Sequence, residues 1–352
     1  MKLFSPFPIR EIEFKNRIAV SPMCQYSAVD GHPTSWHLVH LGSRAIGGAA
    51  LVMTEASAVQ GIGRISIEDA GIYLDAHVDS WRPIVQFIHE HGAIAGMQLA
   101  HAGRKASTEV PWLGGKPIAL NRGGWTPIAP SAVPFDAGYN VPSELTLEEI
   151  DNVVRDFEAA ARRAQEAGFQ VLEIHAAHGY LLHEFYSPFS NHRKDHYGGS
   201  FDNRIRLVLR VAKTIRDFWP ATKPVFVRIS ATDWKEGGWD IEQSVELCRR
   251  LKATGIDLVD VSSAGVIPGV TIPVGPGYQT EFAATIRREA EIATATVGMI
   301  TDPVQAETII STGQADMVLL AREMLRDPYW PRRAAQMLGQ KTKPPVQYER
   351  AW

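Results

Sequence analysis

The stretch TLEEIDNVVRDFEAAARRAQEAGFQVLEIHAA, residues 146–177, joins a helix-patterned segment directly to a short apolar run. Thr146 is a residue type that caps helix N-termini and Gly168 is one that commonly ends helices, so we expect a single helix between them. The run VLEIHAA at 171–177 is nearly continuous in apolar character, which is typical of a parallel strand covered on both faces. The stretch therefore predicts a helix that leads into a buried parallel strand.

The same alternation recurs along the chain. Eight short runs rich in β-branched and aliphatic residues are expected to be strands: RIAVSPM (17–23), ALVMTEA (50–56), IAGMQLA (94–100), VLEIHAA (171–177), PVFVRIS (224–230), LVDVSSA (258–264), ATATVGM (293–299) and MVLLAR (317–322). Other helix-patterned segments lie between them, at 77–91, 202–218, 240–254 and 302–313. Eight β-then-α units predict a TIM (β/α)8 barrel, an α/β fold. The alternative is a doubly wound sheet, which usually has fewer strands and a glycine-rich first turn, whereas no GxGxxG follows the first run.

Composition limits the class of protein. With 352 residues, 45% of them hydrophobic and 21% charged, the chain can bury a large core, and we expect one domain over 1–352. The net charge of -3 shows no basic bias, which argues against a nucleic-acid or anionic-membrane partner. Cys24 and Cys248 cannot form a disulfide framework, and the segment MKLFSPFPIREIEF lacks the apolar core of a signal peptide. No apolar run approaches the roughly 18 residues that span a bilayer, so a reducing cytoplasm is expected.

Two segments depart from the alternating pattern. Residues 101–145, between the third and fourth runs, are rich in Pro, Gly, Trp and small polar residues. A loop this long in a compact domain is usually functional, so we expect a lid over the barrel mouth, with a decorative surface loop as the alternative. Trp112 and Trp125 either close over the site or anchor their own loop. The tail 341–352 ends in Arg350 and Trp352 and is expected to lie at a subunit interface.

In a TIM barrel the chemistry gathers at the carboxyl ends of the strands. Arg228 lies inside the apolar run PVFVRIS, and a buried guanidinium is costly unless an acceptor is within reach. We therefore expect an electron-rich, oxygen-bearing group in the barrel mouth. Polar or reactive side chains follow almost every predicted strand: Cys24, Tyr26, Glu55, Ser57, Gln98, His101, Arg104, His175, His178, Tyr180, Ser262, Ser263 and Arg322.

The last two strand ends suggest what that group carries. TIM barrels often hold a phosphate in the loops after strands seven and eight, on backbone N–H groups and a helix N-terminus. VGMITDP and LLAREML supply Gly298, whose backbone can be approached closely, and Arg322, which can bind a phosphate bidentately. Glycine after a barrel strand is also ordinary turn chemistry. Together with Gln98 and Arg228, the two residues suggest a cofactor with a phosphate at one end and a hydrogen-bonding heterocycle at the other.

Six longer motifs resemble those of one family: SPMCQYS (21–27), EASAV (55–59), QLAHAGRKA (98–106), EIHAAHGYLLHEFYSPFSNHRKDHYGGSFDNR (173–204), FVRIS (226–230) and PVQYERAW (345–352). The resemblance is to the Old Yellow Enzyme family of flavin-dependent ene-reductases, in its thermophilic-like bacterial branch, similar to xenobiotic reductases, and it covers essentially the whole chain. It implies a TIM barrel that binds FMN non-covalently, takes hydride from NADPH, or from NADH, onto flavin N5, and passes it to the β-carbon of activated alkenes such as enones. Quinones and nitro compounds are further implied substrates.

The resemblance also implies which residues contact the flavin. Gln98 corresponds to the amide on the pyrimidine edge, and Arg228 to the cation beside flavin N1 and O2, where a fixed guanidinium stabilises the reduced, anionic form. Relatives often have Gly at the position of Ala321, so this contact departs from the family pattern. The implied FMN-binding residues are Ser21, Pro22, Met23, Cys24, Ala56, Gln98, Arg228, Gly298, Ala321 and Arg322.

The histidine motif carries the implied catalytic residues. His175 and His178 resemble the pair that donates hydrogen bonds to the oxygen of the substrate's electron-withdrawing group, where negative charge grows in the transition state. Tyr180 resembles the proton donor to the α-carbon. Tyr26 resembles a second substrate-facing hydroxyl and Cys24 a residue that tunes the flavin, and core packing is the alternative for both.

Arg350 resembles an arginine that reaches into the active site of a neighbouring subunit. This implies a homodimer or homotetramer in which Arg350 joins the substrate-binding residues, with a frayed terminus as the alternative.

Other interpretations of the motif stay open. A His-x-x-His pair is compatible with zinc, which makes a metal-dependent TIM-barrel hydrolase the competing function. A catalytic zinc site usually has three protein ligands, however, and neither of two common zinc-binding motifs, an HxH in the first run or an HExxH, is present. A structural role for both histidines is a further alternative, as it is for His101. We expect His183 and Glu184 to begin a helix and to pair locally.

Overall fold

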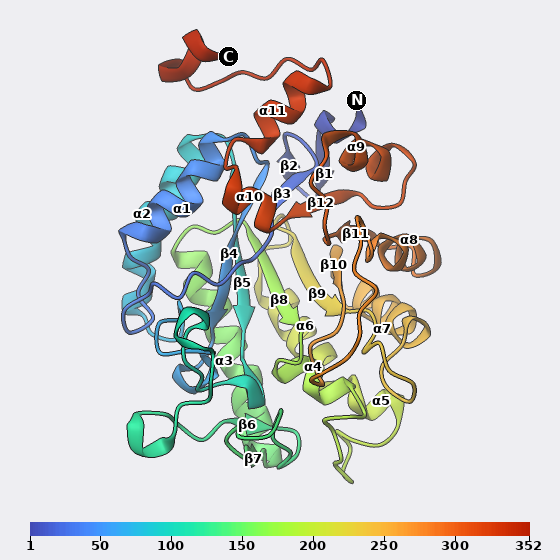
Figure 1. Ribbon diagram of the computed structural model, residues 1–352. Coiled ribbons are helices and arrows are strands. Elements are labelled where there is room, and N and C mark those ends of the chain that lie inside the picture. Colours follow the sequence, from blue (N-terminus) through green and yellow to red (C-terminus); the bar gives the residue numbers. More distant parts are fainter.

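The computed structural model describes residues 1–352 and is built around a closed barrel of parallel strands with helices outside it (Figure 1). The strands follow one another around the barrel in chain order, and the last pairs with the first. The predicted TIM barrel is therefore confirmed. Its strands are β3 (Ile18–Val20), β4 (Leu51–Ala58), β5 (Ile94–Ala100), β8 (Val171–Ala176), β9 (Val225–Ser230), β10 (Leu258–Ser262), β11 (Ala293–Thr296) and β12 (Met317–Leu320).

Helices cover the outside of the barrel, and short strands and 3-10 turns lie in the segments that connect the helices and the barrel strands. The helices are α1 (Ser35–Ile46), α2 (Ala76–Glu90), α3 (Leu147–Glu166), α4 (Leu181–Tyr186), α5 (Phe201–Arg204), α6 (Arg206–Phe218), α7 (Ile241–Ala253), α8 (Thr280–Glu289), α9 (Pro303–Ser311), α10 (Arg322–Arg326) and α11 (Trp330–Met337). The short elements are η1 (Lys2–Phe4), β1 (Phe7–Ile9), β2 (Ile12–Phe14), η2 (Gly61–Gly63), η3 (Gly103–Lys105), η4 (Pro111–Leu113), η5 (Leu120–Arg122), β6 (Ile128–Ala129), β7 (Ser143–Glu144) and η6 (Val346–Ala351). None of the helices combines the length and the apolar character needed to cross a membrane.

Helix α3 shows how the local sequence sets the boundaries. The Thr146 hydroxyl accepts the Glu149 N–H at 3.2 Å, and the Glu149 carboxylate accepts the Thr146 N–H at 2.8 Å, which closes a capping box. Gly168, just beyond the helix, has φ of 98°, the left-handed conformation that glycine adopts without strain. Both predicted ends are confirmed. The helix expected at 202–218 is instead two helices, α5 and α6, separated at Ile205.

Most strands are shorter than the apolar runs that predicted them, although β5 matches its run and β4 continues to Ala58, two residues past the end of its run. Strand β3 ends at Val20 instead of residue 23, and Pro22 has no N–H to extend the ladder. Strand β11 ends at Thr296 instead of residue 299. Several side chains expected at strand ends therefore lie in the loops that follow, which gives them access to the barrel mouth.

The barrel interior is layered, because alternate residues of each strand face inward. Leu51, Met53, Val171, Phe226 and Leu258 belong to an apolar cluster of 13 buried residues at the amino-terminal end of the barrel. Phe14 of the β1–β2 hairpin belongs to the same cluster and closes that end, with its ring centroid 6.3 Å from that of Phe226. The next inward positions toward the carboxyl ends are charged or polar: Gln98, Glu173, Arg228 and Asp260, then His175, Ser230 and Ser262.

The C-terminal tail runs away from the barrel as an extended segment that ends in η6 (Figure 1). Its aromatic rings lie against Tyr329, with centroid distances of 6.2 Å to Tyr348 and 6.5 Å to Trp352. Arg350 is exposed on this tail.

Candidate active site

A charged layer forms the floor of the barrel mouth. Arg228 Nε lies 3.0 Å from an Asp260 carboxylate oxygen on the neighbouring strand, and both side chains are buried. The acceptor that a buried Arg228 requires is thus a carboxylate of the protein itself. From the sequence alone, a bound group in the barrel mouth was expected to be that acceptor. Burial raises the pKa of Asp260, and the Arg228 cation offsets part of the rise.

Gln98 is fixed at the edge of this floor. Its Nε2 donates to Glu173 Oε1 at 2.7 Å, while its Oε1 makes no hydrogen bond within the chain. Burial raises the pKa of Glu173, the neighbouring Asp260 carboxylate raises it further, and Arg228 opposes both. On the other side, Arg228 Nη2 reaches across the barrel to Ser21 Oγ at 3.3 Å. The floor therefore offers an open amide acceptor and a guanidinium, which suits the donors and acceptors on one edge of a planar heterocycle.

A cavity of about 310 Å³ leads from this floor toward the ends of β11 and β12. Gly298 has φ of 133°, and a Cβ there would lie 2.9 Å from a Tyr278 ring carbon, so only glycine fits. Arg322 forms no ion pair, whereas Arg326 in the same wall pairs with Glu323. The lining comprises Arg228, Ser262, Val274, Tyr278, Gln279, Val297, Gly298, Met299, Ile300, Thr301, Leu319, Ala321, Arg322, Glu323 and Arg326.

His175, His178 and Tyr180 come together beside the floor. The His175 ring lies edge-on to the other two, with centroid distances of 5.1 Å to His178 and 4.9 Å to Tyr180. Burial lowers the pKa of both histidines well below the ordinary range, and the Arg228 cation lowers it further, so both rings are neutral near pH 7. Burial raises the pKa of Tyr180, which keeps its hydroxyl protonated.

Hydrogen bonds identify the open nitrogen of each imidazole. His175 Nδ1 accepts the Ala177 N–H at 3.2 Å, so its proton sits on Nε2, which has no partner within the chain. In His178 the roles are reversed, because Nε2 lies 2.7 Å from Ser262 Oγ and Nδ1 is open. Gln279 Oε1 already accepts from Ser263 Oγ at 2.6 Å and lies 3.4 Å from Ser262 Oγ, so the Ser262 hydroxyl is free to donate to the nearer Nε2. With Nε2 as the acceptor, Nδ1 carries the proton. Two neutral imidazoles then present N–H donors to the same region.

Cys24 and Tyr26 border the site on the loop after β3. The thiol pKa of Cys24 is raised by burial and by the Asp69 and Glu55 carboxylates, so the sulfur is a thiol and not a thiolate nucleophile. Trp112 packs edge-on against Tyr26 at 5.9 Å, which places one lid candidate at the site. Trp125 instead donates to the Ile62 carbonyl and lies under Arg64.

The structure decides between several interpretations that the sequence left open near this site. His183 and Glu184 do lie in α4. His183 pairs both locally and at a distance, because its Nδ1 accepts the Gly179 N–H at 2.9 Å and its Nε2 lies 2.9 Å from Asp233 Oδ1. Glu184 does not pair locally: its Oε1 accepts the Arg104 N–H at 2.8 Å. His101 is bound on both nitrogens, by the Gln60 side chain and the Gly103 N–H, and is therefore structural. No group of three or more His, Cys, Asp or Glu side chains is arranged to hold a metal ion.

Four side chains of the site were not singled out from the sequence. Glu173 and Asp260 are charged residues inside apolar runs, the same signal that marked Arg228, so that signal could have found them. Tyr278 lies in a loop and Lys105 in the 3-10 turn η3, and neither carries such a signal. Lys105 Nζ is 5.1 Å from the Tyr180 ring centroid, and burial lowers its pKa to about 8.

Fold and site together are those of a TIM-barrel enzyme with a cofactor-sized cavity at the barrel mouth. The family described as NADH:flavin oxidoreductase / NADH oxidase matches residues 2–341. The NADPH dehydrogenase of Geobacillus sp. (strain WCH70) is 48% identical over 352 residues, which cover 99% of this chain and 98% of the relative. The chain therefore belongs to the NADH:flavin oxidoreductase / NADH oxidase family, that of Old Yellow Enzyme.

Solved structures agree with this assignment. The old yellow enzyme homologue from Zymomonas mobilis matches with a TM-score of 0.80 and 28% identity over 99% of this chain and 96% of that one. A 2-naphthoyl-CoA reductase in complex with 2-naphthoyl-CoA gives a TM-score of 0.86 at 25% identity. That match covers 96% of this chain but 52% of the reductase, so the chain spans about half of its length. The protein is a flavin-dependent oxidoreductase that uses FMN and a nicotinamide reductant.

Proposed function

We propose that the protein is an FMN-dependent ene-reductase that oxidises NADPH and reduces activated alkenes. The observation that carries the proposal is the pair of neutral imidazoles, each with an open nitrogen, beside a half-buried tyrosine whose raised pKa keeps it protonated. The Geobacillus relative is named as an NADPH dehydrogenase, which supports NADPH over NADH as the reductant.

The residues of the floor and cavity fit the proposed cofactor. Gln98 and Arg228 would hold the pyrimidine edge of the isoalloxazine, and Ser21, Pro22, Met23, Cys24 and Ala56 would border the ring. Gly298, Ala321 and Arg322 would hold the phosphate, because the glycine leaves room for a close backbone approach and the arginine has no carboxylate partner. Bound FMN would supply the hydride carrier between nicotinamide and alkene.

The histidines and Tyr180 would act on the alkene. His175 Nε2–H and His178 Nδ1–H would donate to the oxygen of the electron-withdrawing group, which polarises the double bond and stabilises the charge that develops on that oxygen. Tyr180 would then give its phenolic proton to the α-carbon. A tyrosine with a raised pKa is suited to this step, because it holds its proton until carbanion character develops next to it. Tyr26 would border the substrate from the opposite loop.

Oxygen-free absorbance measurements test the function. Purified protein should be yellow, NADPH should bleach the flavin band, and 2-cyclohexenone should restore it. Tyr180→Phe should slow the restoration while FMN stays bound, and an unchanged rate would show that another group supplies the proton. Tyr73→Phe is the matched control, because that hydroxyl bonds only the Asp30 carbonyl outside the site. Colourless protein that carries zinc would support the metal-dependent hydrolase instead.

Three further expectations belong to this proposal. Quinones and nitro compounds are alternative acceptors for the same site. Arg350 on the exposed tail would reach the active site of a second subunit in a homodimer or homotetramer. The chain would work in the cytoplasm, with no nucleic-acid or membrane partner.

A further inference from the structure

The backbone that carries His178 and Tyr180 adopts an unusual conformation. His178 has φ of 59° and Gly179 has φ of 72°, so two consecutive residues lie in the left-handed region. This region is unfavourable for a residue with a Cβ such as histidine, and the surroundings must compensate for it. A Cβ at Gly179 would lie 2.0 Å from the Gly265 carbonyl oxygen, so the turn also presses against the loop after β10.

Side chains hold the polar backbone groups of this turn. The His178 N–H donates to Ser230 Oγ at 2.9 Å, and Ser230 in turn donates to the Ala264 carbonyl. The His178 carbonyl accepts from Lys105 Nζ at 2.9 Å. The Gly179 N–H, between the two proposed catalytic residues, donates to His183 Nδ1 at 2.9 Å. The orientation of His178 and Tyr180 therefore depends on these three side chains.

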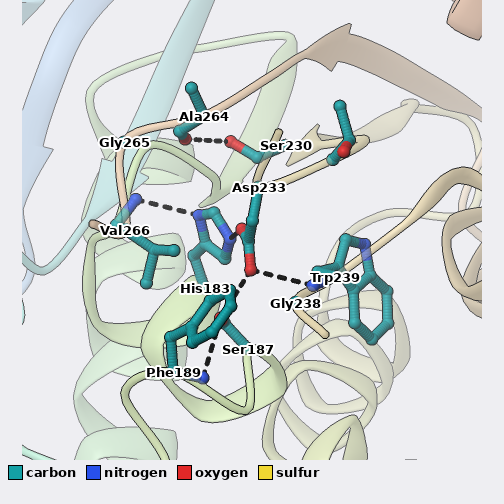
Figure 2. Close-up of polar contacts among 12 residues, drawn as sticks. His183, Ser187, Phe189, Ser230, Asp233, Gly238, Trp239, Ala264, Gly265 and Val266 are labelled. Carbon is teal, nitrogen blue, oxygen red and sulfur yellow. Dashed lines mark hydrogen bonds and ion pairs between the residues drawn. The ribbon is translucent and has the colours of Figure 1, made fainter. Parts of the chain in front are cut away.

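His183 can accept that N–H only in one protonation state. Its Nδ1 must be unprotonated, so its single proton sits on Nε2 and points at Asp233 Oδ1, 2.9 Å away (Figure 2). Both side chains are completely buried, and the His183 ring stacks on Tyr186 with a centroid distance of 4.6 Å. Asp233 thus selects the histidine tautomer that binds the catalytic turn.

Asp233 is itself fixed as a carboxylate. Its Oδ2 accepts from the Ser187 hydroxyl at 2.7 Å and from the Trp239 N–H at 2.9 Å (Figure 2). Burial opposes its ionisation, yet the hydrogen bonds from His183, Trp239 and Ser187 keep the pKa of Asp233 below its ordinary value. An asparagine in its place would turn an N–H2 group toward either His183 or Trp239, and both of these donate hydrogen bonds to the carboxylate.

We propose that Asp233 and His183 are positioning residues for alkene reduction, which fix the His178–Gly179–Tyr180 turn through the Gly179 N–H. Neither touches the substrate. The proposal rests on the proposed function, because it assigns the effect of the pair to His178 and Tyr180. The proposal adds two residues to the site at the barrel mouth: His183 in α4 and Asp233 in the loop after β9.

Asp233→Asn provides the first test, measured in the two half-reactions separately. Re-oxidation of the bleached flavin by 2-cyclohexenone should slow by about 10- to 100-fold, the scale expected when a catalytic group is displaced by a fraction of an ångström to an ångström. Bleaching by NADPH should slow by a smaller factor. Asp257→Asn is the matched control: it removes a carboxylate that binds Arg10 at 2.7 Å and the Val225 N–H at 2.9 Å, at the opposite end of the barrel. This variant should lower the melting temperature and leave both half-reactions unchanged.

The same substitution in a second variant distinguishes a positioning role of Asp233 from a purely structural one. In a chain that already carries His178→Ala and Tyr180→Phe, adding Asp233→Asn should change the re-oxidation rate by no more than about twofold, because the groups through which Asp233 acts are already removed. Independent sites would instead add, and the loss would then be the same in both backgrounds. An equal loss in both backgrounds would overturn the proposal, because Asp233 would then act on the whole fold. If His178→Ala and Tyr180→Phe alone leave re-oxidation at the wild-type rate, the proposed function itself fails.

A second pair of variants keeps the test decisive if Asp233→Asn does not fold. In His183→Asn the amide oxygen takes the place of Nδ1 and can still accept the Gly179 N–H, whereas His183→Leu offers no acceptor. The asparagine variant should keep more of the re-oxidation rate than the leucine variant. Equal rates for the two would contradict an effect through Gly179.

Discussion

Arg322 offers a direct measure of how the chain recognises a phosphate. Its guanidinium faces the 310 Å³ cavity and forms no ion pair within the chain, so it is available to a ligand. A hydrogen bond to a charged group contributes about 1.5–3 kcal/mol, and each 1.4 kcal/mol corresponds to a factor of ten in affinity. Arg322→Met should therefore weaken FMN binding about 10- to 150-fold.

Arg326 is the matched control in the same wall. Its guanidinium already pairs with Glu323 and its side chain is 64% exposed, so its loss should cost at most about 1 kcal/mol, or about a fivefold change in affinity. The assay is a titration of the apoprotein with FMN, followed by the quenching of flavin fluorescence.

Riboflavin, which lacks the phosphate, completes the experiment. Wild type and Arg322→Met should bind riboflavin with the same affinity, because the arginine acts on the phosphate alone. Wild-type FMN affinity in the variant, or an equal loss for FMN and riboflavin, would refute this role of Arg322.

Three more predictions concern the glycine, the acidic residue and the histidine that support the site. Gly298→Ala should weaken FMN binding by at least about tenfold, because a residue with a Cβ is strained at φ of 133° and its methyl group meets the cavity wall; the same titration checks it. Glu55→Gln should lower the free energy of unfolding by about 1–3 kcal/mol, measured by urea denaturation, because one carboxylate accepts the Gln25 N–H at 2.9 Å and lies 2.9 Å from His37 Nε2; a wild-type denaturation midpoint would contradict it. Burial lowers the pKa of His101 to about 3, so between pH 6.5 and 3 the unfolded chain binds a proton that the folded chain does not. Stability should therefore fall on acidification, by up to about 1.4 kcal/mol per pH unit from this group, and His101→Gln should flatten the decline between pH 6.5 and 5.

The fold could be predicted because its signal is repeated. Each of the eight apolar runs overlaps one barrel strand, and a run with the wrong boundaries still keeps its place in the order. Exact strand ends were missed where a local feature, such as Pro22, ends the ladder before the apolar character ends. Which side chains gather at the barrel mouth could be predicted too. They follow the carboxyl ends of the strands, and a barrel with this strand order brings those ends together.

Partners across the barrel could not be predicted. Arg228 and Asp260 meet because β9 and β10 pair in one particular register, and apolar content does not reveal that register. His183 and Asp233 are 50 positions apart and meet through the packing of α4 on the loop after β9. The left-handed His178 gives no signal either, since glycine is the usual marker of that conformation.

The central claim is that neutral imidazoles at the barrel mouth activate the alkene by donating hydrogen bonds to its electron-withdrawing group. The most direct test is the rate at which 2-cyclohexenone re-oxidises the NADPH-bleached enzyme in oxygen-free stopped-flow experiments, compared between wild type and His175→Ala. The account predicts a loss of about 10²- to 10³-fold, the scale for one lost donor to a developing oxyanion, with a smaller effect on bleaching by NADPH. A re-oxidation rate equal to that of wild type would contradict it.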